Sequence, residues 1–191
     1  MRWHKREQCH QLRGLIQLDD AYLGGELAGG KVGRGSENKV PFVAAVSLSN
    51  QGSPLFVKLS LVKGFNLAAI KDWAVKNLAP GCKVLSDGLA CFNAVTDANC
   101  IHTVNVAGAC KPRDLPQFKL VNTVLGNLKT SLAGAYHALD YVKYASGYLA
   151  AFCYRFNRRV DLRTLVVKLM ADTALCGPHP LRVIRAAERY C

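Results

Sequence analysis

Hydrophobic and polar positions follow two different periods along this chain. Three early segments, residues 15–23, 40–49 and 54–62, alternate or run apolar in the manner of β-strands. The residues between the second and third segments, 50–53, read Asn-Gln-Gly-Ser, which is a turn sequence. We therefore predict three strands, of which the last two form a hairpin.

The remainder of the chain changes mostly to helical spacing. Asn66 is the predicted N-cap of a helix over residues 66–78, and Pro80 and Gly81 end that helix. Two short apolar runs predict a fourth and a fifth strand, at residues 82–86 and 101–106. Further helical segments are predicted at residues 89–95 (a short helix or turn), 118–139, 141–159, 162–175 and, as a basic tail, 181–190.

This order of elements predicts a mixed sheet with helices packed on it. It is the order of a ribonuclease H-like fold. We expect an α/β protein with a mixed five-stranded sheet flanked by helices and with extra C-terminal helices. The predicted domain covers residues 15–160, after a basic N-terminal remnant at 1–14 and before a helical C-terminal extension at 161–191.

Composition agrees with a folded domain and adds a strong positive charge. Half of the 191 residues are apolar and the mean hydropathy is +0.08, which excludes a disordered or collagen-like chain. The formal net charge is +12 and the isoelectric point is about 9.5. A domain this basic is typical of proteins that bind a polyanion, most often nucleic acid.

Neither secretion nor a membrane is indicated. The first residues are polar and charged, unlike a signal peptide. The longest stretch without a charge, residues 40–57, contains the predicted turn, so it is no membrane span. The eight cysteines include no C-x-x-C pair, which argues against a zinc ribbon and predicts reduced, mostly buried thiols in a cytoplasmic protein.

Two acidic residues, Asp19 and Asp87, stand at predicted strand ends. Carboxylates placed there are suited to hold Mg²⁺ or Mn²⁺ for phosphoryl transfer, because these ions prefer oxygen ligands. The alternative is a turn or cap role, since Asp87 precedes Gly88. Asp20 adjoins Asp19, and neighbouring strand residues face opposite ways, so we expect only one of the two to point at a metal.

The predicted helix at 118–139 supplies further candidates. Asn122, Gly126, Lys129 and Ala133 are spaced to line one stripe of it. Lys129 lies about 10 Å along the helix axis from Asn122, which suits an ammonium that contacts a DNA phosphate. Asn127 is turned about 140° from Asn122, so the two cannot both be ligands.

Basic residues that we expect to contact DNA lie in two loops and at one helix end. The alternative for each is a solvated basic face, and arginines at a helix C-terminus are also favoured by the helix dipole. The candidates are Lys31, Arg34 and Lys39 in the first loop, Lys111 and Arg113 in the second, and Arg155, Arg158 and Arg159 at the helix end.

Six segments occur in a specific order: QLDDAYLGG at 17–25, GRGSENK at 33–39, SDG at 86–88, VNTVLGNLK at 121–129, GAYH at 134–137 and YRFNRR at 154–159. Together they resemble the DDE domain of bacterial insertion-sequence transposases of the ISXO type. The likeness extends over about residues 15–160, which is most of the chain.

The resemblance implies a DDE-type polynucleotidyl transferase that cuts and joins DNA at transposon ends with Mg²⁺ (or Mn²⁺) on a ribonuclease H-like fold. Asp19 matches the first acid of the family and Asp87 the second. Asn122 matches the third position, 35 residues later, and Lys129 the basic residue seven further on. A branch of the family has Asn rather than Glu there. The implied partners are transposon-end and target DNA and, because transposition normally requires a multimer that holds two ends, further copies of the chain. The implied location is the bacterial cytoplasm, at the nucleoid when DNA is bound.

The chain departs from the family pattern in two places. The segment 148–152 carries no acid, whereas relatives often have one, and only about 14 residues precede the catalytic strand. We therefore expect a catalytic domain that lacks the usual N-terminal DNA-recognition region. The alternatives are a non-catalytic DNA-binding remnant of a truncated transposase, or a generic ribonuclease H-like nuclease. His137, about 22 Å along the helix from Asn122, fits a structural or DNA-contact role better than a metal ligand.

Asn122 also changes the expected charge of the site. An amide offers one neutral carbonyl oxygen where a carboxylate offers two charged ones. With a formal charge of −2 from Asp19 and Asp87, metal affinity should be weak until DNA phosphates join. We expect metal and DNA to bind cooperatively.

Overall fold

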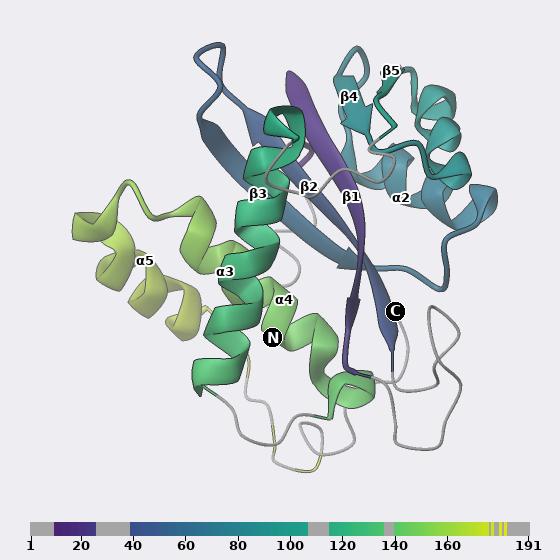
Figure 1. Ribbon diagram of the computed structural model, residues 1–191. Coiled ribbons are helices and arrows are strands. Elements are labelled where there is room, and N and C mark those ends of the chain that lie inside the picture. The colour runs from purple at the N-terminus through teal and green to yellow at the C-terminus, as the bar shows by residue number, and fades with distance from the viewer. Residues whose placement is uncertain are drawn as a thin grey trace.

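The sheet at the centre of the protein has the mixed strand directions that the sequence predicts. The computed structural model describes residues 10–25, 39–106, 115–135, 140–175, 177, 180 and 182. In that part of the chain the strand order is β3-β2-β1-β4-β5 (Figure 1). The β1–β2 and β2–β3 pairs are antiparallel, and the β1–β4 and β4–β5 pairs are parallel. The strands are β1 (Leu15–Leu23), β2 (Val40–Leu48), β3 (Pro54–Leu61), β4 (Lys83–Ser86) and β5 (Ile101–Val104).

The predicted hairpin joins β2 to β3. The Ser49 N–H donates to the Ser53 carbonyl at 2.8 Å, and the Gly52 N–H donates to the Ser49 carbonyl at 2.9 Å. Gly52 has φ 77°, a conformation that favours glycine in a tight turn.

Helices begin where the sequence places their caps. The Asn66 side-chain oxygen accepts a hydrogen bond from the Ala69 N–H at 2.9 Å and so satisfies a donor at the start of α2. The predicted helix at 118–139 is described from Lys119 to Ala135. The helices are α2 (Leu67–Asn77), the 3₁₀ helices η2 (Ala90–Ala98) and η4 (Pro116–Phe118), α3 (Lys119–Ala135), α4 (Tyr141–Asn157) and α5 (Leu162–Ala174).

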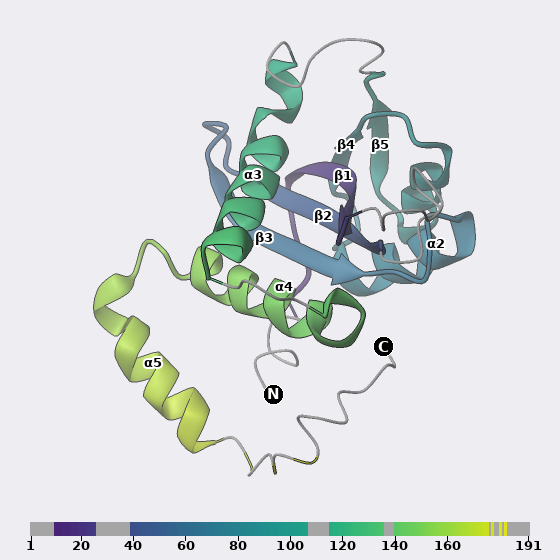
Figure 2. The ribbon, with the colours of Figure 1, turned by 60° about the horizontal axis from the view of Figure 1, so that its bottom comes forward.

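Two hydrophobic cores lie on the two faces of the sheet. α2 and η2 cover one face, and α3 and α4 cover the other (Figures 1 and 2). On β1, Ile16 and Leu18 belong to the core under α2, whereas Leu23 belongs to the core under α3 and α4. Because strand side chains alternate between faces, Asp19 lies on the α3 side of β1 and Asp20 on the α2 side.

The C-terminal end of α4 is fastened to the edge strand β3. The Val57 N–H donates to Asn157 Oδ1 at 2.7 Å, and Asn157 Nδ2 donates to the Val57 carbonyl at 3.0 Å. Arg159 donates to the carbonyl oxygens of Leu55, at 3.2 Å, and of Pro54. Side chains from α4 thus take the place of a neighbouring strand along residues 54–57.

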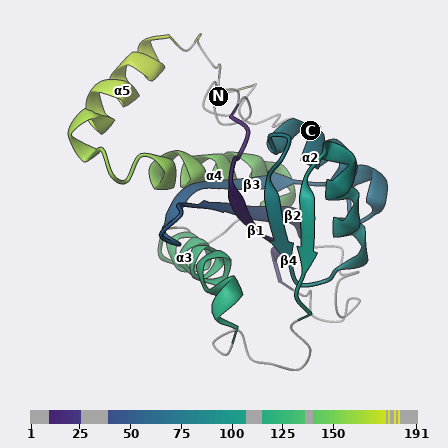
Figure 3. The ribbon, with the colours of Figure 1, turned by 90° about the horizontal axis from the view of Figure 1, so that it is seen from above.

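Helix α5 lies beside these layers and away from the sheet (Figures 2 and 3). The Tyr154 hydroxyl on α4 donates to Asp172 Oδ2 on α5 at 3.1 Å. Val166, Val167 and Met170 on α5 are more than half exposed. None of the helices in the described ranges is long and apolar enough to cross a membrane.

The cysteine prediction is confirmed where the structure describes it. Cys82, Cys91, Cys100 and Cys153 are buried thiols that form no disulfide. Other predictions fall on residues outside the described ranges, so they stay predictions. These concern Lys31, Arg34, Lys111, Arg113, His137, residues 1–9 and most of the tail at 181–190.

Candidate active site

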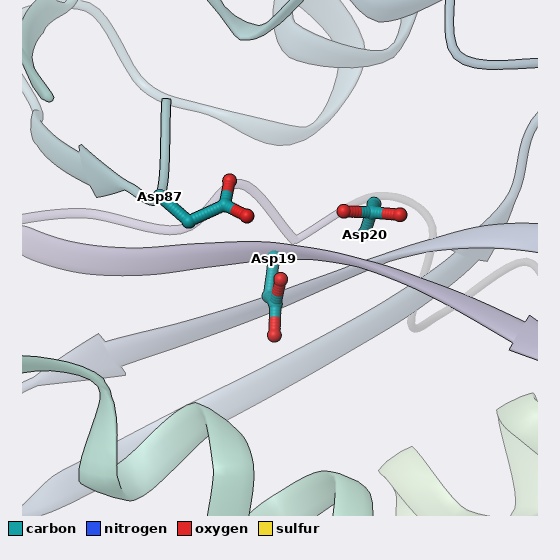
Figure 4. A group of neighbouring side chains, drawn as sticks. All are labelled: Asp19, Asp20 and Asp87. Atoms are coloured by element: carbon teal, nitrogen blue, oxygen red, sulfur yellow. The ribbon is translucent and has the colours of Figure 1, made fainter. Parts of the chain in front are cut away.

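Three carboxylates meet where β4 ends beside β1. The parallel pairing of these strands runs from Leu15 opposite Lys83 to Leu18 opposite Ser86. Asp19 follows Leu18 on β1, and Asp87 follows Ser86 just past the end of β4. Asp20 is the next residue of β1. One carboxylate oxygen from each of Asp19, Asp20 and Asp87 lies within 4.8 Å of the others, and all three residues are half-buried (Figure 4).

The two adjacent aspartates of β1 both reach this place. Figure 4 shows Asp19 and Asp20 pointing to opposite sides of β1, as strand geometry requires, with Asp87 reaching over from the end of β4. The expectation that only one of the pair could approach a metal is therefore too strict. Asp87 follows directly after the last residue of β4, and carboxylates on either side of β1 come near it there.

The backbone around Asp87 forms a sharp turn. The Leu89 N–H donates to Asp87 Oδ1 at 3.3 Å, which is the hydrogen bond of an Asx turn. Gly88 between them has φ 95°. A Cβ on Gly88 would lie 3.0 Å from Val104 Cγ1 and 3.3 Å from Val106 Cγ2. Asp87 therefore takes the turn position that the sequence offered as its alternative role. The same turn fixes the direction of the Asp87 carboxylate.

The side chains of Ser86, which precedes Asp87, and of His102 form a hydrogen-bonded pair. Ser86 is fully buried, and its Oγ lies 2.9 Å from Nε2 of His102 on β5. Burial lowers the pKa of His102, which favours the neutral imidazole.

Helix α3 is held against β1 next to the acids. The Val121 N–H donates to Gln17 Oε1 at 2.9 Å, and Gln17 is 5% exposed. Gln17 precedes Asp19 by two residues, so the two share a face of β1. Asn122, the next residue of α3, is half-buried, and Lys129 two turns later is exposed. The first turn of α3 therefore starts on the face of β1 that carries Asp19.

The comparison with known protein families agrees with this geometry. The family model described as ISXO2-like transposase domain matches residues 11–157, more than three quarters of the chain. The chain belongs to this family. Among curated proteins, none matches it in sequence.

The arginines at the end of α4 have partners within the transposase domain. Arg158 stacks over the Tyr154 ring, with Cζ 3.7 Å from the ring centre, and Arg159 stacks over Phe156 at 3.9 Å. Burial lowers the pKa of Arg159, which also binds β3. Arg155 is exposed and donates to Ser131 Oγ at 3.1 Å. The structure thus gives Arg159 a structural task, and its predicted DNA contact stays a prediction.

Sequence reasoning missed three polar residues whose side chains join separate elements of the fold. Gln17, Asn157 and His102 each bind a residue far away in the chain, at sequence separations of 104, 100 and 16. The signal for Gln17 was present, because a polar residue between the apolar Ile16 and Leu18 shares its strand face with Asp19. For Asn157 and His102 the sequence carries no local signal.

Proposed function

We propose that this transposase domain cleaves DNA strands and transfers them at transposon ends in a reaction that needs Mg²⁺ or Mn²⁺. The observation that carries the proposal is the group of carboxylates from Asp19, Asp20 and Asp87, within 4.8 Å of one another, in a member of a transposase family. Acids from neighbouring strand ends are a common way to bind divalent ions for phosphoryl transfer.

The donor set fits such an ion. Carboxylate oxygens are hard ligands that suit Mg²⁺ and Mn²⁺, whereas thiolates and imidazoles favour other metals. Asp19 and Asp87 would hold the ion, with the Asn122 carbonyl oxygen completing the set. A bound ion of this kind would polarise the phosphate and stabilise the charge that develops on the attacking and leaving oxygens.

The protein's own groups have separate tasks in this proposal. Asp19 and Asp87 fix the site at the ends of two paired strands, and the Gln17–Val121 hydrogen bond holds the first turn of α3 beside them. Lys129, exposed on α3, binds a DNA phosphate. Water attacks phosphorus in the cleavage step and a DNA 3′-hydroxyl attacks in the transfer step. Each step exchanges one phosphorus–oxygen bond for another.

The electrostatics favour joint binding of metal and DNA. Asn122 adds no charge, and the chain as a whole carries +12. DNA phosphates would supply the missing negative charge at the metal while they neutralise the basic surface. We expect Mn²⁺ to bind more tightly in the presence of end DNA than without it. Equal affinity in both titrations would contradict the role given to Asn122.

The deciding experiment is nicking and strand transfer on pre-cleaved transposon-end DNA. Wild type is compared with Asp87→Asn, which keeps the side-chain volume but removes the charge. Asp72→Asn, a surface acid of α2 outside the cluster, is the matched control. We expect metal-dependent products from wild type and Asp72→Asn and none from Asp87→Asn.

Other outcomes point to other functions. DNA binding without cleavage by any of the three proteins would mean a non-catalytic DNA-binding domain. Metal-dependent nicking that is equal on end DNA and unrelated DNA would mean a general nuclease. In either case the proposal of strand transfer at transposon ends fails.

A further inference from the structure

Strand β5 and the two residues after it carry none of the proposed ligands, yet they contact both neighbours of Asp87 in the chain, Ser86 and Gly88. Strand β5 pairs in parallel with β4 over residues 83–86 and 101–104. Just past this pairing, the Asn105 N–H donates to the Ser86 carbonyl at 2.9 Å. Val104 and Val106 pack against the position of Gly88. The strand pairing, the backbone hydrogen bond and the valine contacts thus all hold the turn that contains Asp87.

A side-chain contact also joins β5 to β4, between His102 and Ser86. Ser86 has no exposed surface, and its Oγ lies 2.9 Å from His102 Nε2. Val84, two residues earlier on β4, belongs to the core under α2, so alternation directs the Ser86 hydroxyl to the same side. A buried hydroxyl without a partner is unfavourable, and the imidazole therefore fixes the Ser86 rotamer and the backbone next to Asp87.

The Asp87 carboxylate also accepts a hydrogen bond within its own turn. Its Oδ1 accepts from the Leu89 N–H at 3.3 Å, a long hydrogen bond. Ser86 is the residue through which the hydrogen bonds of His102 on β5 and of Asn105, just past β5, act on the aspartate. Small shifts of Ser86 would move the Asp87 carboxylate relative to Asp19 and Asp20, which are anchored on the continuous strand β1.

We propose that His102 is a positioning residue for the metal site, which acts through Ser86 to hold the Asp87 carboxylate within reach of Asp19 and Asp20. This inference rests on the proposed function and adds to it a residue from a strand that supplies no ligand. Partners behind a metal ligand commonly change metal affinity or activity by about 10- to 100-fold when they are removed.

The test uses three substitutions in β5. His102→Leu keeps much of the volume but removes the hydrogen bond. His102→Gln restores it, because an amide can both donate to and accept from the Ser86 hydroxyl. Thr103→Ala, at the exposed next residue, is the matched control. Mn²⁺ affinity is measured by the loss of the free-ion electron paramagnetic resonance signal in the presence of end DNA, together with strand transfer and the thermal midpoint.

We expect His102→Leu to weaken Mn²⁺ binding about 10-fold, while His102→Gln and Thr103→Ala stay close to wild type. A His102→Leu protein that is less stable but binds Mn²⁺ like wild type would overturn the positioning role. Failure of His102→Gln to restore affinity would overturn it as well. If His102→Leu does not fold, Ser86→Ala deletes the same hydrogen bond from the other side and is read in the same way.

The Asp87→Asn variant distinguishes failure of the proposed metal site from failure of the proposed role of His102. If wild type binds no more Mn²⁺ than Asp87→Asn does, the proposed metal site is wrong and the role of His102 falls with it. If Asp87→Asn abolishes binding and His102→Leu does not weaken it, the function stands and the positioning role alone is wrong.

Discussion

At the scale of single residues, the position of Asp87 depends on neighbours that carry no charge. Gly88 is the clearest case, because φ 95° and the contacts with Val104 and Val106 both disfavour any larger residue there. A glycine after the second acid is thus a requirement of the turn and of the approach of β5. The Asp-Gly dipeptide belongs at once to a turn and to the proposed metal site.

The substitution Gly88→Ala should therefore cost more than an ordinary glycine replacement. A positive φ alone costs about 1–2 kcal/mol, and the Cβ contact at 3.0 Å adds to it. Gly81→Ala is the matched control, because Gly81 also has a positive φ, 81°, but no atom within 4 Å of a new Cβ. Urea unfolding of both variants should show the larger loss for Gly88→Ala. Equal losses would mean that β5 yields to the methyl group.

A second prediction at this scale concerns pH. Burial lowers the pKa of His102 from 6.5, so just below pH 6.5 the unfolded chain binds more protons than the folded one. Stability then falls as the pH drops through this window and levels off below the folded pKa. His102→Gln should lose less stability than wild type between about pH 7.5 and 5.5. Urea midpoints measured across this range test the difference, and parallel curves would contradict it.

At the scale of elements, long-range hydrogen bonds fasten the two helices on one face of the sheet to its strands. Asn157 ties α4 to β3, and Gln17 ties α3 to β1. Both are side-chain amides that bind backbone groups left unpaired at a strand edge or a helix start. These bonds fix individual points of the two helices against the sheet, in addition to the apolar packing between them.

Removal of the Asn157 amide should destabilise the domain. Asn157→Ala leaves the Val57 N–H and carbonyl without their partners, which should cost about 2 kcal/mol. Asn127→Ala, at an exposed site on α3, is expected to be nearly neutral. The measurement is urea unfolding, with hydrogen exchange at the Val57 amide as a local readout. A Val57 amide as protected in the variant as in wild type would contradict the bond's importance.

The sequence predicts the elements well because their signals are local. Alternating or continuous apolar runs mark β1, β2 and β3, the Asn66 cap marks the start of α2, and the turn at 50–53 marks the hairpin. Asp19 and Asp87 come together because strand ends meet in a parallel pair. The nearness of Asp20, the Ser86–His102 pair and the Asn157 bond depends on where strands stop and how helices pack. Asp20, Ser86 and Asn157 stand in segments that carry the family resemblance, but these segments do not show which residues they contact.

At the scale of the whole molecule, the net charge of +12 should appear as salt-dependent DNA binding. Residues with structural partners and exposed residues should then behave differently. Arg159 is bound to β3 and stacked on Phe156, whereas Lys129 is exposed on α3. Substitution of these two residues therefore distinguishes an effect on stability from an effect on DNA binding.

Lys129→Ala should reduce the slope of log affinity against log salt concentration by about 1, with no change in stability. Arg159→Ala should lower the unfolding midpoint, because Arg159 binds a carbonyl oxygen of β3, and a reduced slope in this variant would support its predicted DNA contact as well. Lys76→Ala, in the last turn of α2, serves as the control for loss of a surface charge. Fluorescence anisotropy with end DNA at several salt concentrations gives the slopes. A normal slope for Lys129→Ala would contradict its predicted phosphate contact.

The bond between α4 and β3 also limits how copies of this protein could polymerise. A filament that grows by sheet extension needs two unpaired strand edges on every copy. Here an incoming strand would first have to displace Asn157 and Arg159 from residues 54–57. The Asn157 and Arg159 side chains therefore protect this edge of the sheet against pairing with a strand of another copy.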